Sequence, residues 1–489
     1  MFLLQPLWLC TTLVTGLLSL SSYAAPVAKR AEQCAVAKYS SKPRVFVLTD
    51  ISNEPDDQMS LVRFLTYSNE FQVEGISAVT SVWLNDTVDT PTIREVIKAY
   101  GKVVGNLNSN VPSAGQYPTQ KELLSKVYHG KAVYGLEALK NSTLSSAASA
   151  LIKSVDASDE PLYITVWGGA NVIAEALNHV QSHRTTTQVA TFVSKMRIYS
   201  ISDQDNSGPW IRVNFPSIWY IVSLHGFNSY RSATWTGISG EEYYRFDLGG
   251  PNTTIVTNSW LETNIRVGEL GSYYLNYSYI MEGDTPSFLY LIPNGLGDPE
   301  HPEWGSWGGR YRPDDLSRQN SQVFGDVVDI AEGVDGNEYL SPQASIWRWR
   351  EAFQLDFAQR MQWTINSDYS STNHEPVAIL NDTCGPKSYQ LTYKYGDNIT
   401  LDASSSWDPD DDELTFKWEH YRDVIPSSTT TFPYGEQDTV SKNVTFNALN
   451  DQGSKVEVIP LMNDTLHIIL TVTDGTMPAY RRVILYPTA

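Results

Sequence analysis

The sequence predicts an α/β domain with a mostly parallel sheet and flanking helices, followed by an all-β immunoglobulin-like sandwich. Between residues 43 and about 365, apolar runs of strand length alternate with helical patterns, as in domains built on a parallel sheet. From about residue 374 onwards, short strands separated by turns take over, as in a β-sandwich. A chain of 489 residues is too long for one compact domain, so we expect two, at 40–366 and 374–489.

The N-terminus has the pattern of a secretory signal. An apolar stretch runs over residues 3–20, and the Ser-Tyr-Ala sequence after it suits signal peptidase, so residues 1–24 are expected to be a signal peptide. The dibasic pair that follows would end a propeptide at residues 25–30. No later stretch is long and apolar enough to span a bilayer, and we expect a mature, extracellular glycoprotein. Eight Asn-x-Ser/Thr sequons agree with this expectation: Asn85, Asn141, Asn252, Asn276, Asn381, Asn398, Asn443 and Asn463.

Cysteine usage agrees with secretion. Cys10 lies in the predicted signal, which leaves Cys34 and Cys384 in the mature chain. One disulfide bond between these two is the economical inference, and it would tie the mature N-terminus to the C-terminal region. Two free buried thiols are the alternative.

The charge balance argues against nucleic acid as a partner. The chain carries 55 acidic and 35 basic residues and a formal net charge of −20, whereas nucleic-acid binding depends on neutralising phosphates. An acidic surface is compatible with neutral carbohydrate. The 14 Trp and 28 Tyr residues offer rings that suit the apolar faces of sugars, although most of them are expected in the core.

The candidate site begins at the apolar run of residues 44–49, which reads as a buried parallel strand. Ligands of open α/β sheets bind at the carboxyl ends of such strands. Four carboxylates follow the run as a helical pattern begins, and they would repel one another unless a hard cation such as Ca²⁺ or Mg²⁺ intervened. The alternative is an acidic N-cap on a surface helix. The four residues are Asp50, Glu54, Asp56 and Asp57.

Residues 49–57 (Thr-Asp-Ile-Ser-Asn-Glu-Pro-Asp-Asp) resemble the first-strand motif of the nucleoside-hydrolase superfamily, and more closely that of the secreted, cellulose-binding, nucleoside-hydrolase-like family. The resemblance implies one Ca²⁺ that orients sugar hydroxyls and the attacking water, with Asp50 and Asp57 among its ligands. Ser52 stands where the superfamily has a second aspartate, which serves there as general base and metal ligand. Glu54 is the nearest carboxylate able to take over that role.

Residues 167–171 (Trp-Gly-Gly-Ala-Asn) follow a strand predicted at 162–167 and are similar to a threonine-glycine-rich turn of the superfamily. There the residue before the first glycine donates a backbone carbonyl to the metal, which makes Trp167 a candidate ligand. A glycine pair at such a corner also permits close approach of a ligand. Asn171 here and Asn53 in the first motif are expected to bind substrate.

Residues 203–216 follow a strand predicted at 196–202, and we interpret them as a polar loop that grips the substrate. In the superfamily, a glutamate and an asparagine of the matching segment bind sugar hydroxyls. Asn214 matches the asparagine, Arg212 stands at the glutamate position, and Trp210 is expected to contribute to the grip. The alternative is a solvated turn.

Residues 281–287 supply the last implied ligand. The superfamily carries a histidine-aspartate pair here, in which the aspartate binds calcium and the histidine assists the leaving base. Asp284 matches the ligand, but Gly283 replaces the histidine. That replacement argues against a true nucleosidase more than against glycoside hydrolysis in general.

The loop at residues 294–311 is rich in Gly, Trp and acidic residues, and it has turn chemistry throughout. Trp304 and Trp307 suggest a carbohydrate platform on this loop. Candidates for donating a proton to a leaving oxygen are Glu300, His301 and Glu303. For each of these side chains, packing within a structural loop is the alternative.

A helical pattern around residues 346–361 is expected to be core and to close the first domain. Beyond it, residues 405–414 and 472–475 resemble PKD-like immunoglobulin sandwiches. We interpret the Asp-Pro-Asp run in the first of these segments as a turn rather than as a Ca²⁺ site. The expected strands include residues 391–393, 401–403, 414–418, 468–472 and 482–485.

Two functions follow from these expectations. The first is a secreted glycoside hydrolase of N- or O-glycosidic bonds, in which Ca²⁺ positions a water molecule that Glu54 or Asp56 deprotonates. Its substrate would be a sugar, a cell-wall glycan or a nucleoside-like small molecule. The second is a non-catalytic protein that binds cellulose or another polysaccharide. Neither function involves a nucleic acid or a membrane.

Overall fold

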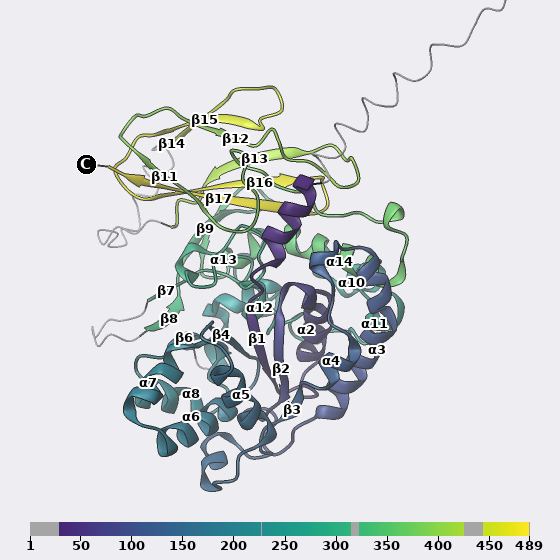
Figure 1. The fold of residues 1–489 in the computed structure, drawn as a ribbon, viewed down its shortest axis with the longest axis vertical. Coiled ribbons are helices and arrows are strands. Elements are labelled where there is room, and N and C mark those ends of the chain that lie inside the picture. The colour runs from purple at the N-terminus through teal and green to yellow at the C-terminus, as the bar shows by residue number, and fades with distance from the viewer. Residues whose placement is uncertain (1–28, 226, 314–321, 425–443, 489) are drawn as a thin grey trace, which may run out of the picture.

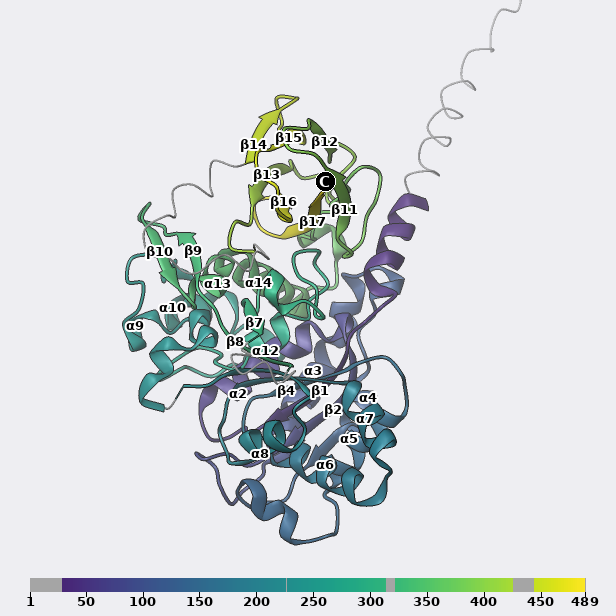
Figure 2. The same ribbon diagram turned by 90° about the vertical axis from the view of Figure 1, so that its left-hand side faces the viewer.

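The computed structural model describes residues 29–225, 227–313, 322–424 and 444–488 (Figure 1). The predicted signal peptide, residues 25–28 of the predicted propeptide and the sequon at Asn443 lie outside these ranges. Within them, no helix combines the length and apolar character needed to cross a membrane. The chain forms an α/β domain with a β-sandwich seated on one end of it (Figures 1 and 2).

Eight strands form the central sheet of the α/β domain: β1 (Arg44–Thr49), β2 (Gln72–Ala78), β3 (Val127–His129), β4 (Leu162–Val166), β5 (Met196–Ser202), β6 (Trp219–Ser223), β7 (Tyr311–Pro313) and β8 (Gln322–Asp326). Their order is β3-β2-β1-β4-β5-β6-β8-β7. All neighbours pair in parallel except β7 and β8. The predicted mostly parallel sheet is therefore confirmed.

Both faces of the sheet are covered, as the side chains of β1 show. Val45 and Val47 pack into one apolar cluster, and Phe46 and Leu48 pack into another. The first cluster includes side chains of α2 (Pro55–Thr66), α3 (Thr90–Ser109), α4 (Gln120–Leu124), α10 (Asn258–Asn264), α11 (Gly268–Gly271), α12 (Pro286–Leu289), α13 (Ala344–Trp347) and α14 (Arg350–Ile365). The second includes side chains of α5 (Ser146–Asp156), α6 (Asn171–His183), α7 (Thr186–Ser194) and α8 (Ser207–Asn214).

The strand order places the carboxyl ends of β1 and β4 side by side in the middle of the sheet. From β1 the chain moves outward to β2 and β3, then returns to β4 beside β1 and continues the other way through β5 and β6. In open α/β sheets, ligands bind outside the strand ends where the order reverses in this way. Asp50 follows β1 directly and Trp167 follows β4, so both lie at this point.

The C-terminal region is a sandwich of two sheets, as predicted. Its strands are β11 (Tyr389–Tyr393), β12 (Ile399–Asp402), β13 (Thr415–His420), β14 (Val444–Ala448), β15 (Lys455–Pro460), β16 (Leu466–Thr473) and β17 (Pro478–Pro487). The sheets have the orders β11-β17-β16-β13 and β12-β15-β14. Lettered A to G in chain order, the strands give the G-F-C and B-E-D groupings of an immunoglobulin fold. A two-stranded sheet of β9 (Asp329–Glu332) and β10 (Glu338–Ser341) had not been predicted.

Buried polar contacts join the two domains. Arg482 of β17 donates hydrogen bonds to the carbonyl oxygens of Leu296 and Trp304, at 2.6 and 3.0 Å. Tyr421 donates its hydroxyl hydrogen to Asp329 at 2.6 Å. Separating the domains would leave such groups without partners, which costs free energy wherever they stay buried. The sandwich is therefore held in one orientation on the α/β domain.

Cys34 and Cys384 form a disulfide bond, which confirms the predicted pairing. The bond joins a helix at residues 29–39 to the sandwich, across 350 residues of sequence. This helix, in purple, runs beside the sandwich in both ribbon views (Figures 1 and 2).

Removing the bond with Cys34→Ser/Cys384→Ser is expected to lower the free energy of unfolding by about 2–5 kcal/mol, because the open chain gains conformational freedom when unfolded. Urea-induced unfolding followed by tryptophan fluorescence measures the change. The reduced wild-type protein is the control and should unfold like the double variant. A double variant as stable as the oxidised wild type would contradict the expectation.

Candidate metal centre

The N-terminus of α2 presents two aspartates at the end of the sheet. Glu54 is the N-cap, and the first turn holds Asp56 and Asp57, where the helix dipole favours negative charge. Thr49, the last residue of β1, donates its hydroxyl hydrogen to Asp57 and accepts a hydrogen bond from the amide of Ile51 at 3.1 Å. The strand end and the helix start are thereby held together.

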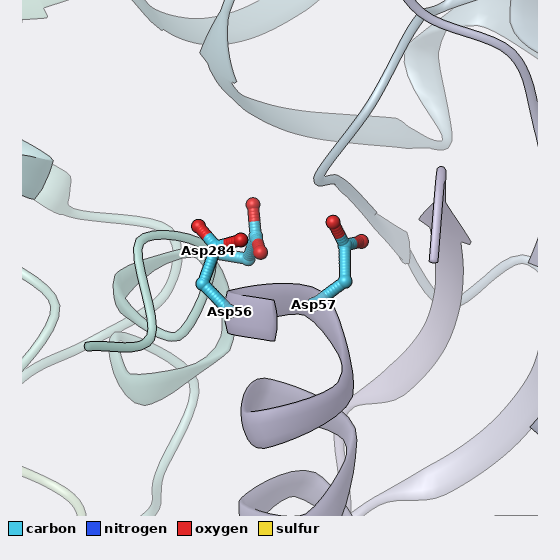
Figure 3. A group of neighbouring side chains, drawn as sticks. All are labelled: Asp56, Asp57 and Asp284. Carbon is cyan, nitrogen blue, oxygen red and sulfur yellow. The ribbon is translucent and has the colours of Figure 1, made fainter. Parts of the chain in front are cut away.

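Asp284 reaches the same point from a loop far away in the sequence. The loop is anchored by Glu282, whose buried carboxylate is bound by Arg63 of α2 at 2.5 Å and whose φ of 56° is in the left-handed region. One carboxylate oxygen from each of Asp56, Asp57 and Asp284 lies within 4.8 Å of the other two (Figure 3). Such spacing suits three ligands of a single cation.

Burial makes these carboxylates costly to ionise. It raises the pKa of Asp57 and of Asp284 well above the usual range, and neighbouring carboxylates add to the effect. Burial, together with the charges of Glu54 and Asp50, raises the pKa of Asp56 to about 7. Burial likewise raises the pKa of Asp50 to about 6.

The chemistry of these donors fits a divalent cation. Oδ2 of Asp284 is buried and has no hydrogen-bond partner among the described residues, so a cation would satisfy it. A positive charge would also offset the repulsion among the aspartates. Since every donor is an oxygen, a hard ion such as Ca²⁺ or Mg²⁺ is favoured.

The aspartates border a cavity of about 320 Å³. The lining contains five acidic side chains, and no Lys, Arg or His of the described chain is part of it. Seven residues predicted as catalytic, metal-binding or substrate-binding are brought together here: Asp50, Asn53, Glu54, Asp56, Asp57, Trp167 and Asp284. Their individual roles remain predictions.

Trp167 lines the cavity directly after β4. Its carbonyl oxygen, the predicted ligand atom, accepts a hydrogen bond from the side-chain amide of Gln204. Its indole N–H donates to Ser287 at 2.8 Å, which fixes the ring. A Cβ at Gly168 would lie 2.6 Å from Oδ1 of Asp50, so only glycine allows this close approach.

Two departures from the superfamily pattern have a structural basis. Ser52 has a φ of 84°, and its hydroxyl donates to Asp89 at 2.5 Å, so the side chain is engaged at the start of α3. At Gly283, a Cβ would lie 2.8 Å from Oδ2 of Asp56 and 3.1 Å from the ring of Trp235. A histidine would therefore require these groups to move.

The predicted polar loop at residues 203–216 contains helix α8, which corrects that interpretation. Pro209 lies in the first turn of this helix, where proline is tolerated. Trp210 packs against Phe215, with ring centroids 5.9 Å apart, and Asn214 donates to the carbonyl of Trp210 at 2.8 Å. Neither side chain is among the residues that line the cavity.

Arg212 and Asn171 also lie outside the cavity lining. Arg212 binds both carboxylate oxygens of Asp203, at 2.9 and 2.6 Å. Asn171 is buried at the start of α6 and donates to the hydroxyl of Thr80 at 2.9 Å. These contacts engage the guanidinium of Arg212 and the side-chain NH2 of Asn171, whereas Oδ1 of Asn171 is buried and has no hydrogen-bond partner among the described residues.

Trp304 and Trp307, predicted as a carbohydrate platform, lie against the sandwich instead. Trp307 is buried, and its indole N–H donates to the hydroxyl of Tyr480 at 3.2 Å. Trp304 stacks on His301 with a centroid distance of 4.0 Å and contacts His467 of β16. The domain interface therefore covers these rings, which corrects the expectation of an open platform on this loop.

The proton-donor candidates of the same loop are engaged elsewhere too. Glu300 pairs with Arg197 at 2.8 Å and accepts a hydrogen bond from Tyr163 at 2.7 Å. His301 contacts Glu303 at 2.8 Å through its Nδ1. None of the three candidates is among the cavity-lining residues.

Six aromatic residues of the lining had not been predicted: Trp83, Tyr230, Trp235, Tyr243, Tyr244 and Tyr279. One follows β2, and the others come from short helices and loops between residues 230 and 279, where no regular period marks them. Gln204 belongs to the segment predicted to grip the substrate but had not been singled out, although it follows β5 closely and the strand-end rule points to it.

The Asp-Pro-Asp run of the sandwich forms a turn, as predicted. Asp408 accepts hydrogen bonds from the amides of Asp410 and Asp412, at 2.7 and 3.2 Å. These three carboxylates also approach within 4.8 Å of one another. Asp410 in addition accepts a hydrogen bond from the backbone amide of His374 at 2.7 Å. This carboxylate therefore binds the segment that links the two domains.

Comparison with known proteins agrees with this fold. Residues 44–311 match the family described as cellulose-binding Sde182, nucleoside hydrolase-like domain, and residues 398–487 match that of the cellulose-binding protein Sde0182, C-terminal domain. A solved nucleoside hydrolase-related hypothetical protein from Saccharophagus degradans, associated with carbohydrate metabolism, is 30% identical with a TM-score of 0.73. The match covers 92% of this chain and 100% of that one.

A more distant solved structure is the inosine-uridine preferring nucleoside hydrolase from Bacillus anthracis. It is 12% identical with a TM-score of 0.32, and the match covers 66% of this chain and 99% of that one. Comparison with curated proteins finds no match.

Proposed function

Since the chain belongs to the family of cellulose-binding Sde182 proteins with a nucleoside hydrolase-like domain, we propose that it is a secreted, Ca²⁺-dependent hydrolase of glycosidic bonds. The observation that carries the proposal is the group of three carboxylates with a buried, unpartnered oxygen beside a cavity. Secretion is supported by the Cys34–Cys384 bond, because disulfides persist in oxidising compartments.

In this proposal, Asp56, Asp57 and Asp284 hold the cation, with Asp50 and the carbonyl oxygen of Trp167 next to them. When bound, Ca²⁺ supplies the positive charge that binds neighbouring sugar hydroxyls and makes a water molecule more acidic. The aspartates fix the position of that charge relative to the cavity.

Glu54 is the residue we assign as general base. It lines the cavity, it is half-buried, and burial raises its pKa, which brings its basicity closer to that needed near neutral pH. Asp56 was the other candidate, but its carboxylate belongs to the group around the proposed cation. Glu54 would take a proton from water as the water oxygen bonds to the anomeric carbon. The bond between that carbon and the leaving group would break through an oxocarbenium-like transition state, and the leaving atom would take up a proton from solvent.

The test is hydrolysis of a panel of nucleosides, aryl furanosides and soluble cell-wall glycans, with added Ca²⁺ or with a chelator. We expect release of free sugar in the presence of Ca²⁺ and its loss with chelator. Nucleosides are expected to be the poorest substrates, because the position of the base-assisting histidine is occupied by Gly283. Turnover that survives chelation would contradict the proposed role of the cation.

A second candidate function is carbohydrate binding without catalysis. It is favoured by Ser52, which stands where the superfamily has its second aspartate and therefore provides no carboxylate there. The hydroxyl of Ser52 is bound to Asp89. The family descriptions of both domains also name cellulose binding. Sedimentation with insoluble cellulose, with no sugar released from any member of the panel, would favour this function over hydrolysis.

The raised pKa values also determine how stabilisation by Ca²⁺ depends on pH. A carboxyl group with a higher pKa in the folded than in the unfolded chain binds its proton preferentially when folded. The metal-free protein therefore loses stability as the pH rises from about 4 through the folded-state values, which are about 6 for Asp50 and about 7 for Asp56. A bound cation keeps these groups ionised and removes that loss.

We therefore expect Ca²⁺ to raise Tm more near pH 7.5 than near pH 5. Differential scanning fluorimetry with Ca²⁺ or chelator at both pH values measures this difference. An equal shift at both values would show that these carboxylates do not bind the ion.

A further inference from the structure

A continuous series of aromatic rings leads from the carboxylates to the surface. Trp235 is buried, and a Cβ on Gly283 would lie 3.1 Å from its ring and 2.8 Å from Oδ2 of Asp56. From Trp235 the series continues to Tyr244 at 6.5 Å between ring centroids, then to Tyr243 at 4.9 Å. All of these residues except the glycine line the cavity.

The series ends on two exposed rings. Tyr243 packs against Tyr279 with ring centroids 5.4 Å apart, and the two residues are 53% and 52% exposed. Single exposed aromatics are common on proteins. Two adjoining ones that border a cavity are more informative, because aromatic faces are suited to the apolar faces of sugars. We call Tyr243 and Tyr279 the tyrosine shelf.

The geometry of the shelf favours a single chain over a flat crystalline surface. The two rings are inclined at 61° to each other, so they do not form one plane. The cavity of about 320 Å³ is at the small end of the range for ligand pockets, about 300–1,000 Å³. A longer ligand must therefore extend out of the cavity, and the shelf forms part of the cavity's border at the surface.

Charge narrows the class of ligand further. Five carboxylates and no described Lys, Arg or His line the cavity. A single divalent cation would leave a net negative lining, which repels phosphates and uronic acids. A neutral sugar chain meets no such penalty.

We propose that the site binds the end of a neutral oligosaccharide, with the terminal sugar beside the carboxylates and the next unit on the tyrosine shelf. The inference rests on the proposed carbohydrate function of the cavity. It adds that the protein recognises the end of a sugar chain through at least two sugar units. The shelf contributes to affinity for the second unit and leaves binding of the first unchanged.

The test is calorimetric titration of the full chain with glucose, cellobiose, cellotetraose and digalacturonate in the presence of Ca²⁺. Cello-oligosaccharides are the neutral probes because the family description names cellulose. We expect cellobiose to bind about tenfold more tightly than glucose, with little further gain for cellotetraose and no binding of digalacturonate. The gain in affinity from glucose to cellobiose should disappear in the double variant Tyr243→Ala/Tyr279→Ala.

Two controls separate the shelf from other effects. Tyr243→Phe/Tyr279→Phe keeps both rings and should keep the gain. Tyr395→Ala removes a 61% exposed tyrosine of the sandwich and should also keep it. Unchanged Tm and glucose affinity in the alanine variant would show that its cavity is intact.

The proposal is overturned if no neutral oligosaccharide binds, if cellobiose binds no better than glucose, if digalacturonate binds equally well, or if the alanine variant retains the gain. Its failure is distinct from failure of the proposed hydrolysis. A shelf-dependent gain without sugar release would refute catalysis alone, whereas Ca²⁺-dependent sugar release without the gain would refute the shelf alone.

Discussion

Asp284→Asn is expected to abolish Ca²⁺ binding and to lower kcat/KM by about 10³-fold. The substitution keeps the shape of a buried side chain but removes one of three carboxylates that approach within 4.8 Å. A metal ion contributes several kcal/mol of transition-state stabilisation, and each factor of ten corresponds to about 1.4 kcal/mol. Calorimetry with Ca²⁺ and the sugar-release assay measure the two effects.

The asparagine variant also separates loss of function from loss of fold. Burial and neighbouring carboxylates raise the pKa of Asp284, so removing its charge relieves repulsion in the metal-free protein. We expect the metal-free variant to be at least as stable as the metal-free wild type. Asp159→Asn, at a side chain that is 99% exposed, is the matched control and should change neither measurement. Full Ca²⁺ binding by Asp284→Asn would mean that the site has been misplaced.

Arg63→Met is expected to lower the free energy of unfolding by about 3–5 kcal/mol, because it leaves a buried carboxylate without its charged partner. Arg63 and Glu282 are both fully buried and pair at 2.5 Å. Arg63 also donates to the carbonyl oxygen of Phe353 at 2.9 Å. Methionine fills part of the volume but supplies none of these hydrogen bonds.

The same variant should weaken Ca²⁺ binding, since Glu282 anchors the loop that carries Asp284. Urea-induced unfolding and Ca²⁺ titration measure the two consequences. Arg184→Met breaks a partly exposed pair with Asp156 and is expected to cost less than about 1 kcal/mol. If the two arginine variants are equally stable, the buried pair does not hold the loop as we describe.

Most residues of the proposed metal centre could be placed at one end of the sheet from the sequence, because they follow strand ends and helix starts. Asp50 and Asp57 stand on either side of one turn, and Trp167 follows a second apolar strand, so the strand-end rule brings them together. Asp284 could be predicted as a ligand only through the family resemblance, since nothing in the sequence of its own loop indicates where that loop packs. The buried Arg63–Glu282 pair, which places it, joins residues far apart in the sequence.

Of the seven residues predicted to bind substrate, Asn53 lines the cavity and the other six do not. Trp304 and Trp307 lie in a Gly-rich loop whose sequence suggests exposure, but the sandwich covers both rings. No local sequence pattern predicts that contact. The rings that do border the cavity, including Tyr243 and Tyr279, come from short helices and loops without a regular period. Only the folded chain brings them to one place.

The most direct test of the account is a crystal structure of the full chain soaked with Mn²⁺, a Ca²⁺ substitute that is visible by anomalous scattering. We expect one strong peak among the carboxylate oxygens of Asp56, Asp57 and Asp284, lost when Ca²⁺ competes for the site. Saturating Mn²⁺ with no peak at these oxygens, or a peak only at another position, would contradict the metal centre and the hydrolysis proposed from it.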